Sequence, residues 1–312
     1  MNEEKDIIKQ KQANNHLPKN TRTSCVILNY NDAATVEKLV QKIYHYTVFD
    51  AIVLVDNCST DNSLAQLQAL AQKLNEKIIV LSAPKNGGYG AGNNVGIRYS
   101  YQVLHIDYVL VANPDVDFSE QLIQKMLRLF ERHPALGVVS SCMHDPVFGK
   151  QRNGWPLYGF WRELARCGPI CRRVFRKLLE YPEWYFHHKK AVYVDAVHGS
   201  LLMVDAQKMM ECGGYDEGLF LYQEEAVLGC RMQKAGYRSA LLLTHSYHHL
   251  HSTSISQTYQ KTWERQQLRN QSCMYYYQHY LHINPIQYLA AKLFFQAIHL
   301  EIWLYEKIVC LR

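Results

Sequence analysis

The chain has 312 residues, of which 48% are hydrophobic and 20% charged, with a formal net charge of +6. This apolar content is enough for a real core and excludes a wholly disordered chain. The most apolar segment, 286–311, is interrupted by Lys292, Glu301 and Glu306 and is expected to be amphipathic, so the sequence predicts no membrane-spanning helix.

Residues 1–20 are polar and lack the apolar core of a signal peptide, so we expect a short flexible or helical tail. The first half of the chain then alternates between apolar runs of strand length and segments with helical spacing. Expected strands cover 24–30, 51–57, 77–83 and 107–113, and expected helices cover 33–46, 61–74 and 91–102. This alternation predicts an α/β fold, with a mostly parallel sheet covered by helices on both faces.

Polar residues stand at or just after the ends of three expected strands: Asn29, Asn31, Asp56, Asn57, Asn113, Asp115 and Asp117. In parallel sheets, ligands bind beyond the carboxyl ends of the strands, so we expect these side chains to gather along one edge. Asp115 and Asp117 would suit a hard divalent cation that also binds water and phosphate oxygens. The alternative is a turn-forming pair without a ligand.

A glycine-rich segment, 86–96, leads into the third expected helix. Crowded glycines let the backbone approach a phosphate or a sugar closely. The spacing fits neither the dinucleotide fingerprint GxGxxG nor the Walker pattern, so this segment alone does not identify a nucleotide site. The nine cysteines show no paired zinc-site spacing, and we expect free thiols in a reducing cytosol.

Residues 150–190 form a basic, aromatic segment, with ten Lys or Arg against three Glu and with Trp155, Trp161 and Trp184 interleaved. Such a patch suits anionic lipid headgroups or a diphosphate-linked acceptor. A solvated insertion without a partner is the alternative. No nucleic-acid-binding motif accompanies the patch, and we expect no nucleic-acid partner.

Glu224 and Glu225 open an expected helix that runs to about Ala235. A carboxylate at a helix N-terminus is favoured electrostatically, which is a purely structural explanation. At the mouth of a cleft it would instead serve as a general base, and the residues alone leave both explanations open. Beyond residue 255 the chain becomes helical and tyrosine-rich. The last apolar segment would pack on the domain or on a second copy, or would lie in a membrane interface.

Six segments, taken together, resemble one family: 26–32, 55–63, 86–97, 109–116, 194–237 and 248–254. In this order and spacing the chain resembles the inverting family-2 glycosyltransferases with the GT-A fold, especially the rhamnosyltransferase-like branch. The resemblance implies a GT-A domain over 21–255 that contains the basic aromatic insertion at 150–190. It would follow the tail at 1–20 and precede a C-terminal helical segment at 256–312.

The resemblance implies a nucleotide-sugar site built from the strand ends and the glycine-rich loop: Asn29, Asn31, Asp56, Asn57, Gly88, Asn94 and Asp115. It also implies Mg²⁺ or Mn²⁺ held by Asp115, with Asp117 assisting through water. His249 would lie near the metal or the diphosphate, and His248 and His251 are its close rivals.

The resemblance implies that Asp195 and His198 flank the acceptor side and that Glu225 aligns with the catalytic base. The family usually carries Glu-Asp where this chain has Glu224-Glu225, and its second acid on the helix is Val227 here. These departures keep Glu224, otherwise an acceptor-side residue, as an alternative base.

The expected activity is metal-dependent transfer of a sugar with inversion, most simply L-rhamnose from dTDP-rhamnose, onto a hydroxyl of a cell-surface polysaccharide or lipid-linked glycan precursor. Expected partners are the nucleotide-diphosphate sugar, the glycan or lipid-linked acceptor, an anionic membrane surface, and a second copy through the C-terminal helices. The expected location is the cytoplasmic face of the cell membrane.

Three alternatives compete with this expectation. The first is a transferase that uses a UDP-sugar donor, and the second is a degenerate, non-catalytic protein that binds sugar nucleotides or glycans. The third is a nucleotidyltransferase, which would need a glycine-rich basic loop after the first strand, where this chain has residues 29–35, NYNDAAT, instead.

Overall fold

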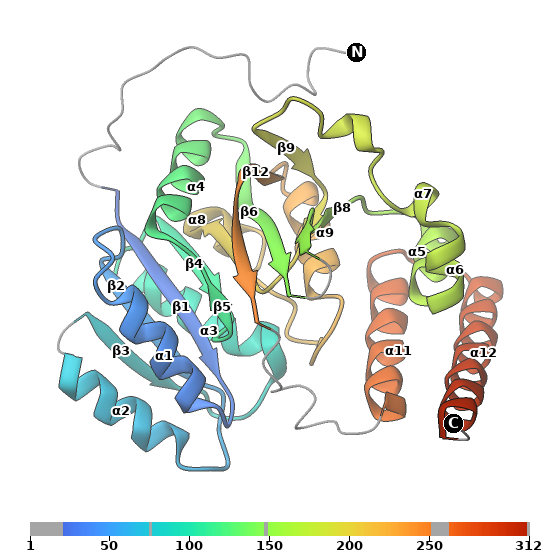
Figure 1. Ribbon diagram of the computed structural model, residues 1–312, viewed down its shortest axis with the longest axis horizontal. Helices are drawn as coiled ribbons and strands as arrows, with labels where there is room; N and C mark the ends of the chain where they lie inside the picture. The colour runs from blue at the N-terminus through green and yellow to red at the C-terminus, as the bar shows by residue number, and fades with distance from the viewer. Residues whose placement is uncertain (1–20, 75–76, 147–148, 251–261, 311–312) are drawn as a thin grey trace.

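The computed structural model describes residues 21–74, 77–146, 149–250 and 262–310. Over these residues one ten-stranded sheet forms the centre of the molecule (Figure 1). Its strands follow the order β3 (Ile78–Ser82), β2 (Ala51–Asp56), β1 (Thr23–Asn29), β4 (Tyr108–Ala112), β11 (Leu201–Asp205), β6 (Leu136–Asp145), β12 (Arg238–His249) and β5 (Val116–Asp117). In addition, β7 (Gly149–Gln151) pairs with β6, and β9 (Ala191–Val194) pairs with β12.

The described helices are α1 (Ala33–Ile43), α2 (Ser63–Leu74), α3 (Gly88–Gln102), α4 (Glu120–Arg132), α5 (Phe160–Cys167), α6 (Pro169–Val174), α7 (Arg176–Leu179), α8 (Ala206–Glu211), α9 (Glu224–Lys234), α11 (Thr262–His279) and α12 (Pro285–Cys310). A short 3₁₀ turn, η1, covers Glu183–Tyr185, and β8 (Gly154–Trp155) pairs with β10 (Ala196–Val197) in a second, two-stranded sheet.

Strands β1 to β4 pair in parallel because their side chains are apolar on both faces and must be covered twice. Ile27 and Leu54 point into one core with helices α1, α2 and α4. Val26 and Val53 point into the other, with α3, α8 and α9. The expected α/β fold with a mostly parallel sheet is therefore confirmed.

Antiparallel pairing enters where β11 lies between β4 and β6, a placement that the alternation of the first half does not predict. Strand β12 then runs parallel to β6, and its last residues pair with the short strand β5, His249 opposite Val116. Because β5 directly follows Asp115, this pairing carries the polar end of β4 to the end of β12.

The C-terminal helices pack against the α/β domain, one of the three arrangements expected for the last apolar segment. Phe160 and Leu164 of α5, Tyr277 of α11 and Phe295 of α12 share a third apolar core. Figure 1 shows α5 and α6 beside α11 and α12 at one end of the molecule. No helix in the described residues is long and apolar enough to cross a bilayer.

Helix α11 also supports the turn that leads into α9. The Ser272 hydroxyl donates to the Leu221 carbonyl oxygen at 2.6 Å, and the Tyr280 hydroxyl donates to Asp216 Oδ2 at 2.5 Å. Arg231 of α9 completes the group, with Nη2 3.2 Å from Asp216 Oδ2. Burial disfavours the charged form of Asp216, but hydrogen bonds from Tyr280 and the Gly218 amide, together with Arg231, outweigh it and lower the pKa of this carboxyl.

The Asp216→Ala variant should lose about 2–3 kcal/mol of unfolding free energy at pH 7, because Arg231 and Tyr280 lose a charged acceptor. A lowered pKa contributes stability above the ordinary pKa of 3.8, and this contribution disappears as the pH falls through the folded pKa. The difference between the proteins should therefore shrink in urea titrations below pH 3.8. Tyr280→Phe keeps the ion pair and should cost only about 1 kcal/mol. Equal unfolding free energies for Asp216→Ala and the parent at pH 7 would show that the contacts of Asp216 do not stabilise the turn before α9.

Candidate active site

The polar ends of β1 and β2 meet because Asn29 lies opposite Asp56 in the parallel register. Asn29 Nδ2 donates to Asp56 Oδ1 at 2.9 Å, and the Ser59 backbone N–H donates to Asp56 Oδ2 at 3.0 Å. Asn31 adopts a left-handed φ of 54° and accepts the Thr60 N–H at 2.8 Å. Asn29 and Asp56 are buried and fix the turn at 57–60, whereas Asn31 is exposed beside it.

Asn57 connects this edge to the start of helix α3. Its Nδ2 donates to Asn86 Oδ1 at 2.9 Å and to the Gly88 carbonyl oxygen at 3.2 Å. Its Oδ1 is buried and has no hydrogen-bond partner within the described residues. This oxygen is therefore an acceptor that a bound ligand can satisfy.

The expectation that Gly88 and Asn94 line a loop is wrong, because helix α3 already begins at Gly88. Gly88 has a φ of +89°, and a Cβ there would lie 2.0 Å from the Phe220 carbonyl oxygen. Asn94 is buried inside the helix, where it accepts the Tyr215 N–H and donates to the Tyr215 carbonyl, both at 2.9 Å. Both residues thus hold α3 against the 213–223 turn.

Tyr89 joins α3 to the turn before β11, and sequence reasoning missed it. Its hydroxyl donates to the Gly199 carbonyl oxygen at 2.6 Å, and its backbone N–H donates to the Phe220 carbonyl oxygen at 3.0 Å. Burial, with the nearby Tyr215 and Glu225, raises the pKa of Tyr89 well above its ordinary value, so the hydroxyl stays a donor. Its position as a large side chain among the glycines of 86–92 was the available signal.

Glu224 and Glu225 begin helix α9 after two residues in left-handed conformations, Tyr222 (φ 72°) and Gln223 (φ 69°). Such conformations cost roughly 1 kcal/mol or more each and persist only where the surroundings impose them. Here the surroundings include the Ser272 bond to Leu221 and a hydrogen bond from Gln223 Nε2 to the Cys273 sulfur at 3.1 Å.

The two glutamates occupy different environments. Glu224 is only 5% exposed, and its Oε1 has no hydrogen-bond partner in the described part of the chain. Burial, followed by the charge of Glu225, raises the pKa of Glu224 to about 8. Glu225 is partly exposed and accepts the Gly199 N–H on its Oε1 at 3.2 Å.

The pairing of β5 with β12 places Asp115 beside His249, with Oδ1 and Nε2 3.2 Å apart and both side chains largely buried. The His198 ring meets the His249 ring edge to face, with centroids 5.8 Å apart. His198 Nδ1 accepts the Ser200 N–H at 3.1 Å, and the Ser200 hydroxyl lies 2.7 Å from the Tyr247 hydroxyl. The turn at 198–200 therefore lies between the Asp115–His249 pair and Glu225.

Asp117 and Asp195 were also expected in the site, but their carboxylates bind other parts of the protein. The carboxylate of Asp117 pairs with Lys42 of helix α1 and is about half exposed. Asp195 accepts the Leu157 N–H at 3.0 Å and the Gln233 side-chain N–H at 2.9 Å, so both of its oxygens bind other parts of the protein.

His248 and His251 were the alternatives to His249 near the metal or the diphosphate. The His248 ring packs on His144, with centroids 4.9 Å apart. His251 lies outside the described residues.

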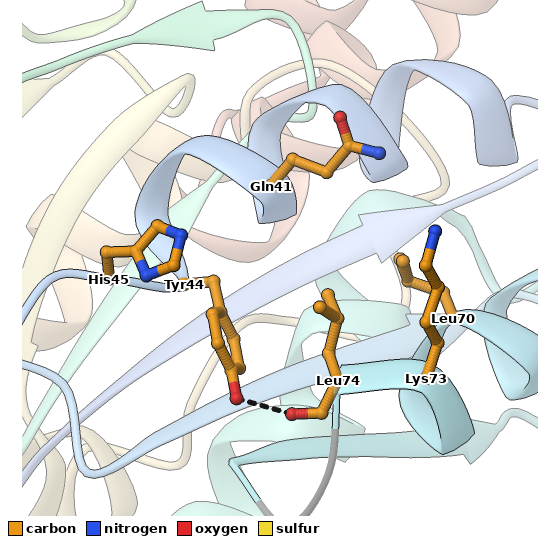
Figure 2. A pocket seen from close by; sticks show the side chains of 6 residues that line it. All are labelled: Gln41, Tyr44, His45, Leu70, Lys73 and Leu74. Atoms are coloured by element: carbon orange, nitrogen blue, oxygen red, sulfur yellow. Dashed lines mark hydrogen bonds between the residues drawn. The ribbon is translucent and has the colours of Figure 1, made fainter.

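A cavity of about 260 Å³ lies between helices α1 and α2, lined by Gln41, Tyr44, His45, Leu70, Lys73 and Leu74 (Figure 2). The Tyr44 hydroxyl crosses one end of it and donates to the Leu74 carbonyl oxygen. These residues belong to the last turns of both helices or to the residues just after α1. Because helices of α/β units run antiparallel to the strands, this cavity lies at the edge of the sheet opposite the polar strand ends.

No group of three or more His, Cys, Asp or Glu side chains in the described residues is arranged to hold a metal ion by itself. Asp115 and His249 offer one carboxylate oxygen and one imidazole nitrogen at adjacent positions. Manganese accepts both atom types, and magnesium binds through one or two carboxylates together with water and substrate phosphates. The pair therefore fits a cation that a diphosphate completes.

A protein-family model, "Glycosyl transferase family 2", matches residues 24–184. The hexosyltransferase Agl10 of low-salt glycan biosynthesis in Haloferax volcanii is 28% identical over 202 residues, 65% of this chain and 58% of that protein. The N-acetylglucosaminyl-diphospho-decaprenol L-rhamnosyltransferase of Mycobacterium tuberculosis is 28% identical over 223 residues, 65% of this chain and 68% of that protein. The chain thus spans less than two thirds of the haloarchaeal relative.

Two solved structures share the fold at low identity. The mannosyltransferase PcManGT from Pyrobaculum calidifontis, in complex with GDP-Man and Mn²⁺, superposes with a TM-score of 0.54 at 13% identity, over 88% of this chain and 69% of that one. GalNAc-T7 with UDP, GalNAc and Mn²⁺ gives a TM-score of 0.57 at 14% identity, over 76% and 45%. Because the family model covers more than half of the chain and the sheet has the GT-A arrangement of these structures, this chain belongs to glycosyl transferase family 2 and has the GT-A fold.

Proposed function

We propose that this chain transfers a sugar from a nucleotide-diphosphate donor to an acceptor hydroxyl, with inversion and with the help of a divalent cation. The observation that carries the proposal is the turn at 198–200. Gly199 binds Glu225 on one side, and His198 meets the Asp115–His249 pair on the other. The proposed base and the two proposed metal ligands thus flank one short piece of backbone.

In this mechanism Glu225 removes the proton from the acceptor hydroxyl. The acceptor oxygen then attacks the anomeric carbon from the face opposite the diphosphate. The new carbon–oxygen bond forms as the old one breaks, and the diphosphate leaves with the electron pair of the broken bond. One displacement inverts the anomeric configuration, and no covalent enzyme intermediate is needed.

Several residues position the proposed base and the cation. The Gly199 N–H orients the Glu225 carboxylate, and Tyr89 fixes Gly199 through its carbonyl oxygen. Because the pKa of Glu224 is raised to about 8, this buried acid holds its proton at neutral pH and is not available as the base. Asp115 and His249 would hold Mg²⁺ or Mn²⁺, which when bound stabilises negative charge on a departing diphosphate.

We propose a nucleotide pocket beside Asn29, Asn31, Asp56 and Asn57, because these residues gather at the polar strand ends next to helix α3.

For the donor we propose dTDP-L-rhamnose, and for the acceptor a cell-surface polysaccharide or lipid-linked glycan. The resemblance of the sequence and the named activity of the mycobacterial relative support both. A UDP-sugar is the alternative donor. Thermal shift against a panel of nucleotide sugars distinguishes them, because a ligand of the folded state raises the melting temperature.

The Glu225→Gln variant should lose about 10²–10⁴-fold in turnover while donor binding survives, because only the proton acceptor is removed. Glu224→Gln is the matched control. It replaces a protonated acid with a neutral amide and should change turnover little at pH 7. Radiolabelled sugar transfer and donor hydrolysis measure both variants.

Full activity in Glu225→Gln would exclude this residue as the base, and loss confined to Glu224→Gln would assign the role to Glu224. A parent protein that neither transfers nor hydrolyses any donor would favour a non-catalytic binding protein.

Asp115→Asn should abolish the metal-dependent part of donor binding, because the amide is a poor ligand for a hard cation. Asp117→Asn is the control, since the Asp117 carboxylate pairs with Lys42. Melting temperatures with donor and Mn²⁺, with and without chelator, provide the measurement. If Asp117→Asn loses the chelator-sensitive shift and Asp115→Asn keeps it, the assignment of Asp115 is wrong.

The protonation of Glu224 also makes stability depend on pH. Between its ordinary pKa of 4.5 and about 8 the unfolded chain ionises while the folded protein keeps the proton, so stability falls as the pH rises through this window. The cost reaches at most about 4–5 kcal/mol. Glu224→Gln should therefore melt higher than the parent at pH 8.5, and this advantage should vanish near pH 4.5.

Calorimetry at both pH values provides the measurement for Glu224→Gln. Glu37→Gln, which removes one carboxylate at an exposed position, is the control. An advantage of Glu224→Gln that is the same at both pH values would show that Glu224 is ionised in the folded protein.

A further inference from the structure

Helices α6 and α7 expose apolar side chains that a soluble helix would normally bury. Ile170, Val174 and Leu178 are 60%, 67% and 59% exposed, and Phe175 between them is 46% exposed. The first three are four residues apart in a nearly continuous helical segment, so they follow one side of it. The buried Leu179 fixes the end of this segment to the protein.

The same segment is strongly basic. Arg172, Arg173, Arg176 and Lys177 are all exposed and lie between the exposed apolar residues. The nearest acid in sequence is Glu180, which pairs with Arg176 at 3.0 Å. We call the exposed side chains of residues 170–178 the basic apolar surface.

The neighbouring elements extend the apolar character of this end of the molecule. Helix α12 contacts Gly168 through the Phe294 ring, directly before α6. Its exposed residues Ile286, Leu289 and Leu293 have helical spacing, and they are 75%, 57% and 58% exposed. Figure 1 shows α6 and α7 at the end of the molecule away from α1 and α2.

We propose that the basic apolar surface docks on an anionic lipid bilayer. The apolar side chains would enter the boundary between headgroups and acyl chains, and the arginines and Lys177 would bind the lipid phosphates and anionic headgroups. A symmetric contact with a second copy would bring two basic surfaces together, which electrostatic repulsion opposes. Exposed apolar side chains between the basic ones fit a bilayer better than a purely ionic partner, because a bilayer offers both environments.

Vesicle sedimentation with the full chain tests the proposal, independently of any transferase activity. Vesicles of phosphatidylcholine alone should bind little protein, and vesicles with an equal share of phosphatidylglycerol should bind it in a salt-sensitive way. Because each basic residue near an anionic surface contributes about 1 kcal/mol, the double variant Arg172→Gln/Arg173→Gln should bind about 30-fold more weakly. The control double variant Lys38→Gln/Lys73→Gln removes the same charge from α1 and α2 and should bind like the parent.

The apolar part of the contact has its own test. Val174→Ser keeps every charge and should weaken binding about fivefold, whereas Val103→Ser changes a similarly exposed valine after α3 and should have no effect. All these side chains are exposed, so melting temperatures should stay at the parent value.

Three results would overturn the proposal. The first is the absence of binding to anionic vesicles, and the second is unchanged binding by both Arg172→Gln/Arg173→Gln and Val174→Ser. The third is a dimer in sedimentation velocity that dissociates in Val174→Ser, which would make this surface a contact between copies.

Discussion

Two adjacent acids at the start of helix α9 must occupy different environments, and the local structure around them follows from this constraint. Burial and the charge of Glu225 raise the pKa of Glu224 to about 8, although two backbone hydrogen bonds act in the opposite direction, so this buried carboxyl keeps its proton at neutral pH. Glu225 meets the sheet edge and has an amide donor, Gly199. Placing one acid inside and the next outside requires an abrupt turn. The left-handed Tyr222 and Gln223 provide this turn, and α3 and α11 hold it.

Two other connections bring distant parts of the chain to the same edge. The pairing of β5 with β12 joins Asp115 to His249 across more than a hundred residues of sequence, and the 198–200 turn joins that pair to Glu225. Backbone groups carry much of this organisation: the Gly199 amide and carbonyl each fix one functional side chain. Strand pairing and hydrogen bonds therefore fix the relative positions of Asp115, His249 and Glu225.

Sequence patterns predicted the features that depend on local order and failed where packing decides. Apolar runs located β1 to β4, and the strand-end rule placed Asn29, Asp56 and Asp115 at the same edge of the sheet. The glycines of 86–92 suggested a loop, yet they allow α3 to begin close to the Phe220 backbone, a contact with a residue far away in the sequence. Asp117 was expected to assist Asp115 through water, whereas its carboxylate pairs with Lys42 of α1. The contacts of Tyr89 and Tyr247 are tertiary, and the one signal in the sequence was the position of Tyr89 as a large side chain among the glycines of 86–92.

The contact between helix α11 and the 216–223 turn also bears on how such chains diverge. A terminal extension without contacts to the turn before α9 could be exchanged between homologues without affecting the site. Here Ser272, Cys273 and Tyr280 contact the backbone and side chains directly ahead of the acids. A chimera that imported another terminus would therefore also alter the packing of the turn before Glu224 and Glu225, unless residues 216–223 were transplanted with it. The C-terminal helix and the 216–223 turn are therefore expected to change together among related proteins, although more than forty residues separate them along the polypeptide.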